Sequence, residues 1–176
     1  MSDRITIIGE FRMVARDPRT KVFYPGLVVA KMLWDTDWFR NTVMTAAIND
    51  MLAVTYVNGT QKPQWYIAPI NATPSPSIIV GDTAATHAGW AEATTYAETS
   101  RQQYNPTVSN KVMSNASSAA TITANGGVDV YGAFIISDNT ISGTSGILGA
   151  AGAFTGGTQH LVSTQTLDLL YRQTVS

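Results

Sequence analysis

The sequence contains no cysteine. Disulfide bonds, thiolate metal sites and a cysteine nucleophile are therefore excluded, and with them the zinc-ribbon and thiol-redox classes of protein. Histidine is almost as scarce, because His87 and His160 are the only imidazoles in the chain. A metal site would have to combine both of them with Asp82 or Glu92, and no H-E-x-x-H or comparable spacing is present. We predict no metal site.

Charged residues are also few, at 13% of the chain, and their signs nearly cancel. With a net charge of −1, the chain gives no sign of the basic surface that nucleic-acid binding requires, so no nucleic-acid partner is expected. Of the 23 charged residues, 13 fall between Asp3 and Asp50, whereas the second half is rich in the chain's 23 threonines and 13 serines. A neutral, hydroxyl-rich surface is easily desolvated, which favours contact with other proteins.

Long apolar runs are absent as well. None approaches the roughly 20 residues that span a bilayer. The first residues, Met1 to Arg4, are not followed by the apolar core of a signal peptide. We therefore expect no membrane partner, and a protein that is made and assembled in a cytoplasm.

Residues 1–34 are expected to form an extended arm or hairpin outside the main domain. Side chains alternate in character from Arg4 to Val14, as in a strand with one drier face. Asp17-Pro18-Arg19-Thr20 has proline at the second position, which β-turns favour. Lys21 to Trp34 indicates a second extended segment, and residues 35–176 are predicted to form a single β-rich domain.

One helix is predicted over about residues 40–57, because apolar residues recur there at helical spacing. Asp35 to Asp37 is expected to supply its N-cap, and Asn58-Gly59 to end it.

From Gln64 the apolar period changes to two, which predicts short strands separated by glycine and asparagine turns. Pro69 to Pro76 is predicted as an exposed loop, residues 81–90 as a turn, and Trp90 to Thr99 as an extended segment with Trp90 and Tyr96 on one face.

Alanine and glycine dominate residues 147–157, which favours close backbone approach to another strand or to a neighbouring subunit. The pattern indicates a mainly β fold, a two-sheet sandwich or jelly-roll-like domain. Strands are predicted at 65–68, 119–124, 127–137, 147–154 and 166–175.

Catalytic motifs are missing. The chain has no nucleophile elbow, because Ser145 lacks the second glycine of G-x-S-x-G, and it has no nucleotide-binding glycine motif. We therefore predict no catalytic and no cofactor-binding residue. Structural roles are favoured instead: Asp82 caps a turn, Glu92 pairs with Arg101, and His87 bonds backbone carbonyls to fix the loop beside Trp90.

Six aromatic residues leave two interpretations open. Stacking on a sugar would make them a carbohydrate platform, whereas burial would make them anchors of a core or a subunit interface. Core packing is the more common use and is favoured here. The residues are Trp34, Trp38, Trp65, Tyr66, Trp90 and Tyr96.

An ordered series of short motifs runs through the chain. Trp65-Tyr66-Ile67 comes first, followed by G-D-T-A-A-T-H-A-G-W-A-E from Gly81, then G-A-F from Gly132 and G-T-S-G-I-L from Gly143. Over roughly residues 40–174 this series resembles a family of small virion structural proteins of tailed bacteriophages. The sequence departs from the family pattern at Ala68-Pro69 and at Thr164-Gln165-Thr166. The positions that carry the resemblance are Trp65, Tyr66, Asp82, Thr83, His87, Gly89, Trp90, Glu92, Tyr96, Arg101, Gly132, Phe134, Gly143, Thr144, Gly146, Leu148, Phe154 and Leu167.

The resemblance implies a non-enzymatic capsid decoration or cement protein on the virion surface. Its partners would be the major capsid protein and other copies of itself, with a trimer as the expected oligomer. In this interpretation the arm at residues 1–34 contacts the capsid and Trp90 is buried. A tail or fibre component acting as a receptor-binding adhesin is the alternative, and it would expose aromatic residues at a loop tip. A small carbohydrate-binding module is a third hypothesis.

Overall fold

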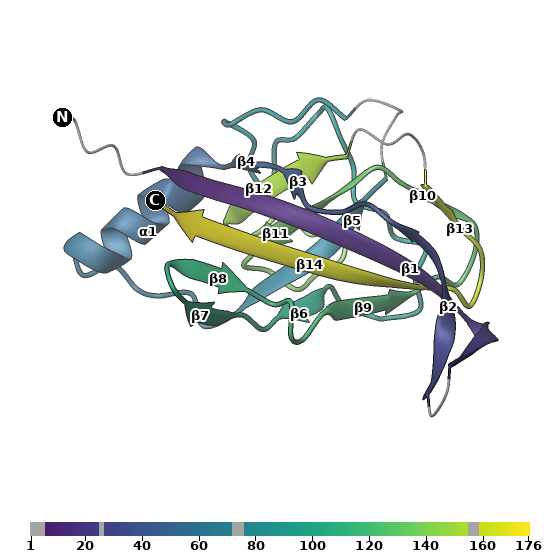
Figure 1. The fold of residues 1–176 in the computed structure, drawn as a ribbon. Coiled ribbons are helices and arrows are strands. Elements are labelled where there is room, and N and C mark those ends of the chain that lie inside the picture. Colours follow the sequence, from purple (N-terminus) through teal and green to yellow (C-terminus); the bar gives the residue numbers. More distant parts are fainter. Residues whose placement is uncertain (1–5, 25–26, 72–75, 155–158) are drawn as a thin grey trace.

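The computed structural model describes residues 6–24, 27–71, 76–154 and 159–176 (Figure 1). Nearly half of these residues lie in antiparallel strands, as the sequence predicted. The strands are β1 (Ile7–Tyr24), β2 (Leu27–Asp35), β3 (Phe39–Arg40), β4 (Thr42–Val43), β5 (Trp65–Ile70), β6 (Gln102–Tyr104), β7 (Thr107–Ser109), β8 (Val112–Ser114), β9 (Ala120–Thr123), β10 (Val128–Val130), β11 (Gly132–Ile136), β12 (Leu148–Ala153), β13 (Gln159–Leu161) and β14 (Thr166–Val175). Among the described residues the one helix is α1 (Thr45–Tyr56).

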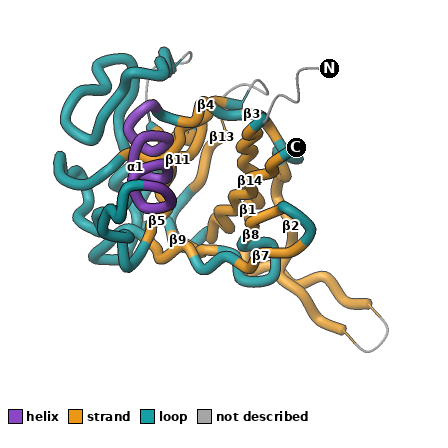
Figure 2. Tube along the Cα trace, turned by 90° about the vertical axis from the view of Figure 1, so that its left-hand side faces the viewer, coloured by secondary structure: helices purple, strands orange, loops and turns teal. Residues whose placement is uncertain are grey.

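Two sheets form the body of the molecule, and they lie side by side in Figure 2. The first has the order β2-β1-β14-β8-β7, with β3 added to β1 and β9 added to β14. The second has the order β4-β12-β11-β5-β6, and a small third sheet pairs β10 with β13. The fold is thus mainly β and sandwich-like, which confirms the predicted class.

The main core lies between the two sheets. Phe11 of β1 and Tyr171 of β14 meet there with ring centroids 4.8 Å apart, and Ile67 and Ile135 enter from the second sheet. A second core covers the outer face of the second sheet, because alternate residues of β11 point to opposite faces. Phe134 therefore packs in the second core while its neighbour Ile135 packs in the main one, which explains why every residue of β11 is buried.

Helix α1 confirms the predicted helix, although it is shorter. Asn58 takes a left-handed conformation (φ 57°) just after the helix, and the Gly59 amide donates to the carbonyl of Ala53, so the predicted end is also confirmed. The predicted N-cap at Asp35 to Asp37 is wrong. Helix α1 begins after Met44, which is fully buried and gives no side-chain cap, because the preceding residues instead form the edge strands β3 and β4.

The first strand corrects the expectation that the N-terminal arm stands outside the sandwich. Residues Ile7 to Arg16 pair with β14 along their whole length, and Phe11 and Met13 are fully buried in the main core. The apolar side chains that alternate along a strand need a covered face, and the second sheet covers that face of β1 across the main core. Only the part beyond Arg16, paired with β2, leaves the body as a hairpin (Figures 1 and 2).

Three local predictions after Gln64 are wrong. Pro69 belongs to β5 and not to a loop; its carbonyl accepts from Ala93 on the side away from β11, so its missing N–H interrupts no bond to β11. In the segment from Trp90 to Thr99, predicted to be extended, only isolated bridges form, and Trp90 and Tyr96 do not share a face, because Trp90 packs in the second core and Tyr96 in the main one. The predicted strand 127–137 is split into β10 and β11, which belong to different sheets. Residues 72–75 of the predicted loop lie outside the described residues.

Candidate interaction surfaces

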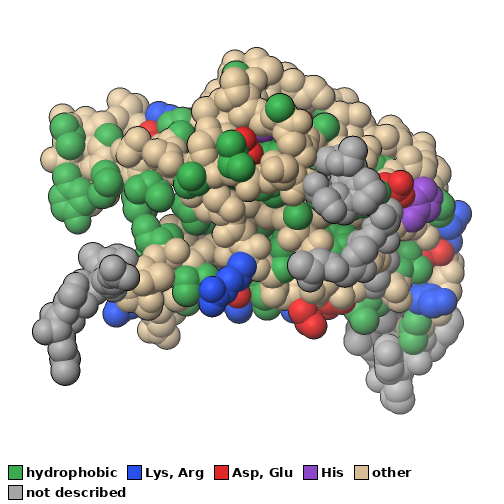
Figure 3. All heavy atoms as spheres, turned by 90° about the horizontal axis from the view of Figure 1, so that it is seen from above, with side chains coloured by type: hydrophobic (Ala, Val, Ile, Leu, Met, Phe, Trp, Pro, Cys, Tyr) green, Lys and Arg blue, Asp and Glu red, His purple; other side chains and the backbone are tan. Residues whose placement is uncertain are grey.

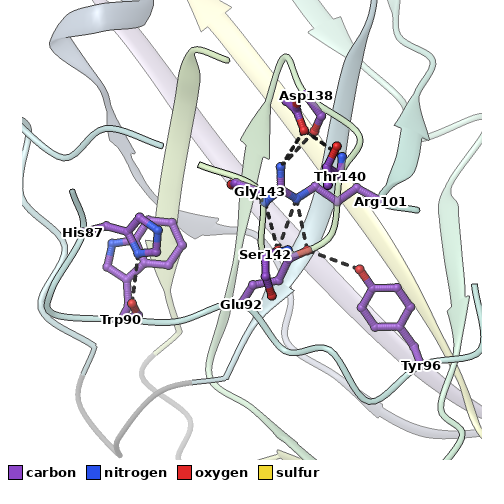
Figure 4. Close-up of polar contacts among 9 residues, drawn as sticks. All are labelled: His87, Trp90, Glu92, Tyr96, Arg101, Asp138, Thr140, Ser142 and Gly143. Carbon is purple, nitrogen blue, oxygen red and sulfur yellow. Dashed lines mark hydrogen bonds and ion pairs between the residues drawn. The ribbon is translucent and has the colours of Figure 1, made fainter. Parts of the chain in front are cut away.

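The turn predicted at residues 81–90 is held closed by three of the motif residues. The Asp82 carboxylate accepts from the Trp90 indole N–H at 2.9 Å and from the Ile79 amide at 3.1 Å. The His87 ring stacks on the Trp90 ring at 4.1 Å between centroids, and its Nδ1 lies 3.0 Å from the Trp90 carbonyl oxygen (Figure 4). Asp82 thus caps the turn and His87 fixes the loop beside Trp90, as predicted.

The predicted pair of Glu92 and Arg101 is the second element of this region. Arg101 Nη2 donates to Glu92 Oε2 at 2.9 Å, and Arg101 Nε also donates to the same carboxylate (Figure 4). Both side chains are almost fully buried. The remaining guanidinium nitrogen, Nη1, donates to the Asp138 carbonyl at 2.9 Å, and Nη2 also reaches the Gly143 carbonyl. All three nitrogens of Arg101 are therefore engaged.

Glu92 is equally saturated. Its carboxylate accepts from the Ser142 amide at 2.7 Å and from the Tyr96 hydroxyl at 3.2 Å, in addition to Arg101 (Figure 4). Burial, reinforced by the nearby Glu92 charge, raises the pKa of Tyr96 well above its usual value, so the phenol stays protonated and donates. The Glu92–Arg101 pair therefore ties the turn region to the loop after β11 and leaves no polar atom of either side chain free for catalysis.

A small cavity of about 270 Å³ adjoins this pair and is lined by several motif residues. His87, Trp90 and Arg101 all reach it, but each already has a partner within the protein. Among the described residues no group of three or more metal-ligating side chains is close enough to hold a metal ion. No described helix is both long and apolar enough to cross a membrane. The convergence of the motif residues therefore has a structural explanation.

The aromatic residues do not gather on one exposed platform in the described part of the chain. Trp90 and Tyr96 are buried, in different cores. Trp38 lies instead against the Arg172 guanidinium, 4.3 Å from its ring centroid, and Trp65 packs against the main core. This arrangement favours the packing interpretation over the sugar platform.

An apolar groove of about 410 Å³ lies between α1 and the near ends of β1, β7, β8 and β14. The helix contributes Ile48, Met51 and Val54, and the strands contribute Val108 and Val175, among others. The ion pair between Lys62 and Asp50, at 3.2 Å, lies on the same groove. Sequence analysis did not identify this site, because its lining comes from strands far apart in the chain.

Helix α1 adds an exposed apolar surface beside the groove. None of its residues is buried, and at its end Tyr56 and the following Val57 are 79% and 76% exposed. Figure 3 shows hydrophobic side chains gathered at this end of the molecule. One signal was available in the sequence: residues 45–56 carry only four polar side chains, too few to give the helix a continuous polar face.

The hairpin of β1 and β2 forms the second candidate surface. Beyond Arg16, β1 pairs only with β2 among the described residues, so both outer edges of the hairpin are open. Register shifts between Ala15 and Arg16 and between Asp17 and Lys21 mark irregularities at its base, and such bulges bend a strand pair. Lys21, Lys31 and Met32 are exposed on it.

Comparison with known proteins returned no match: no family model fits the chain, and no curated protein or solved structure is significantly similar to it.

Proposed function

We propose that this chain is a structural protein of a tailed-phage virion that decorates the capsid and stabilises the assembled shell without catalysing a reaction. The projecting hairpin of β1 and β2 carries the proposal, because it reaches beyond the body and exposes unpaired strand edges. The motifs that resemble those of phage virion proteins add support, since their side chains stabilise the fold and do not build a reaction centre.

A hairpin without a partner is only marginally stable, and this supports a role as a contact arm. Two-stranded hairpins in water are marginally stable, and open strand edges bind other strands readily. Lys21 and Lys31 are exposed, and neither forms an ion pair with a described residue. A shell surface with acidic side chains and a free strand edge would therefore satisfy both the backbone and the charges of the hairpin. The proposed partner is the major capsid protein.

Decoration by a symmetric oligomer, with a trimer as the proposed form, would let several weak arm contacts act together. Each bound arm raises the effective concentration of the others near the shell, so detachment requires several contacts to open at once. The adhesin alternative requires aromatic residues exposed at a loop tip, and the burial of Trp90 and Tyr96 does not favour it.

The test is binding of purified protein to phage particles that lack it, followed by sedimentation and electron microscopy of the recovered particles. The proposal expects density repeated over the shell. A variant with Thr20 to Lys31 replaced by a two-residue turn should keep its thermal unfolding transition and lose binding. Density confined to the tail, or binding to host-cell glycan without shell binding, would replace this proposal with the adhesin.

A further inference from the structure

We infer that the surface around α1, formed by the groove and the exposed helix end at Tyr56 and Val57, binds a second copy of this chain. The helix end of one copy enters the apolar groove of its neighbour. This contact needs no phage shell, so it can be tested on purified protein whether or not the shell-binding proposal holds.

The helix itself indicates that its surface is covered in the functional state. Isolated helices of about 12 residues are marginal in water, and in proteins they are stabilised mainly by packing of an apolar face. Helix α1 has 12 residues, no buried residue and no side-chain N-cap bond. A helix that is apolar on most of its circumference is normally buried, and here the chain's own sheets cover only one side.

The two parts of this surface match in chemistry. Tyr56 and Val57 project from the end of α1, and the groove beside α1 offers about 410 Å³ lined mostly by apolar side chains. Val108, at the groove rim, is itself 75% exposed. Aromatic side chains that enter apolar pockets are typical anchors of protein interfaces. The projection and the pocket therefore exist together on every copy, as self-association requires.

Charge does not oppose contact between copies. Asp50 and Lys62 neutralise each other within the chain, so Lys111 is the one lining residue with a charge and no ion pair among the described residues. Six of the exposed large hydrophobic side chains of the described residues lie on α1, directly after it or on the groove: Met51, Leu52, Tyr56, Val57, Val108 and Val175. Exposed apolar side chains gathered in this way mark sites of contact between proteins.

A constitutive partner fits this surface better than an occasional one. The helix requires cover whenever the chain is folded, including before any shell has assembled, and another copy is the partner present from synthesis onward. Obligate interfaces of this kind are more apolar than transient ones. The neutral, apolar composition around α1 matches that description.

The first experiment measures the mass of the purified chain by sedimentation velocity over a range of concentrations. The protein should sediment as a closed oligomer, a small multiple of 18.8 kDa. The double variant Tyr56→Ser/Val57→Ser should raise the dissociation constant at least about tenfold, as expected for loss of interface anchors. The matched control is Val162→Ser, which removes an exposed valine next to β13, and it should leave the mass unchanged.

A second experiment tests the contact directly and uses the absence of cysteine. Val57→Cys and Val108→Cys are made in separate chains, mixed and oxidised. A disulfide-linked dimer should form between the two variants, whereas a mixture of Val57→Cys with Val162→Cys should stay unlinked. Two results would overturn the inference. One is a wild-type chain that stays monomeric at about 100 μM, a concentration far above the dissociation constant of a stable interface. The other is equal cross-linking in both mixtures.

Discussion

Arg101 and Glu92 form an ion pair whose side chains are only 3% and 5% exposed, with Arg101 Nη2 lying 2.9 Å from Glu92 Oε2. Burying two charges is costly unless every polar atom finds a partner. Here the Asp138 and Gly143 carbonyls, the Ser142 amide and the Tyr96 hydroxyl complete the network. The pair therefore fixes one loop conformation, and its stability depends on both charges being present.

Replacing Arg101 by methionine should destabilise the protein by about 3–5 kcal/mol, because the Glu92 carboxylate would remain buried without its counter-charge. Denaturant unfolding followed by tryptophan fluorescence measures this loss. The control is Arg16→Met, which removes the half-exposed pair of Arg16 with Asp168 and should cost no more than about 1 kcal/mol. Equal costs for the two substitutions would show that burial does not make the Glu92–Arg101 pair more costly to break.

A second prediction concerns the close approach of β11 and β12. A Cβ atom added at Gly132 would overlap the Gly152 carbonyl oxygen on the neighbouring strand. Gly132→Ala should therefore cost about 1–3 kcal/mol or more, because backbone cannot move aside as a side chain can. At Gly81 an added Cβ meets nothing within 4 Å, so Gly81→Ala should be neutral or slightly stabilising. Thermal unfolding of both variants distinguishes them.

The small residues of β12 also show what sequence patterns can predict. Their small size predicted close backbone approach to another strand or to a neighbouring subunit, and the contact is with β11 in the same chain. Likewise, carboxylate and ring chemistry were sufficient to predict the structural roles of Asp82 and His87 and the pairing of Glu92 with Arg101. The predictions for these three side chains succeeded because each depends on groups within ten residues of one another.

Features that depend on distant strands could not be predicted. Alternation identified β1 as a strand, but nothing local showed that its partner would be β14, at the other end of the chain. The same limit hid the groove, whose walls are Val108, Val175 and helix α1. The prediction of a single strand over residues 127–137 was wrong for a related reason: the alternation continues through Tyr131, where the chain passes from one sheet to another.

A third prediction concerns alkaline pH. Burial raises the pKa of Tyr171 to about 12, from an unfolded value of about 10, so the folded state holds this proton more tightly. The resulting stability is complete below about pH 10 and is lost as pH rises toward 12, an effect of about 3 kcal/mol. Burial also raises the pKa of Tyr104, which acts in the same direction.

Tyr171→Phe should therefore flatten the decline of the free energy of unfolding between about pH 10 and pH 12, although the loss of its bond to Gln173 lowers stability somewhat at every pH. Urea unfolding at several pH values measures the slope. The matched control is Tyr56→Phe, which changes an exposed ring. If Tyr171→Phe and wild type lose stability in parallel, burial of this phenol does not govern the alkaline transition.

The last prediction concerns the turn between β7 and β8. Ser109 pairs with Val112, so Asn110 and Lys111 form a two-residue loop, and both have positive φ, at 50° and 63°. Two-residue hairpin loops of this type favour asparagine followed by glycine. Asparagine tolerates the left-handed region, whereas lysine is strained there by about 1–2 kcal/mol.

Lys111→Gly should relieve that strain, and because glycine loses more backbone entropy on folding, the net gain should be about 0.5–1 kcal/mol. The Lys111 carbonyl, which accepts from the Val175 amide, is retained in the variant. We expect a higher thermal midpoint for Lys111→Gly and no such rise for Asn110→Gly. A lower midpoint for Lys111→Gly would show that the lysine side chain contributes more stability at this position than its backbone strain costs.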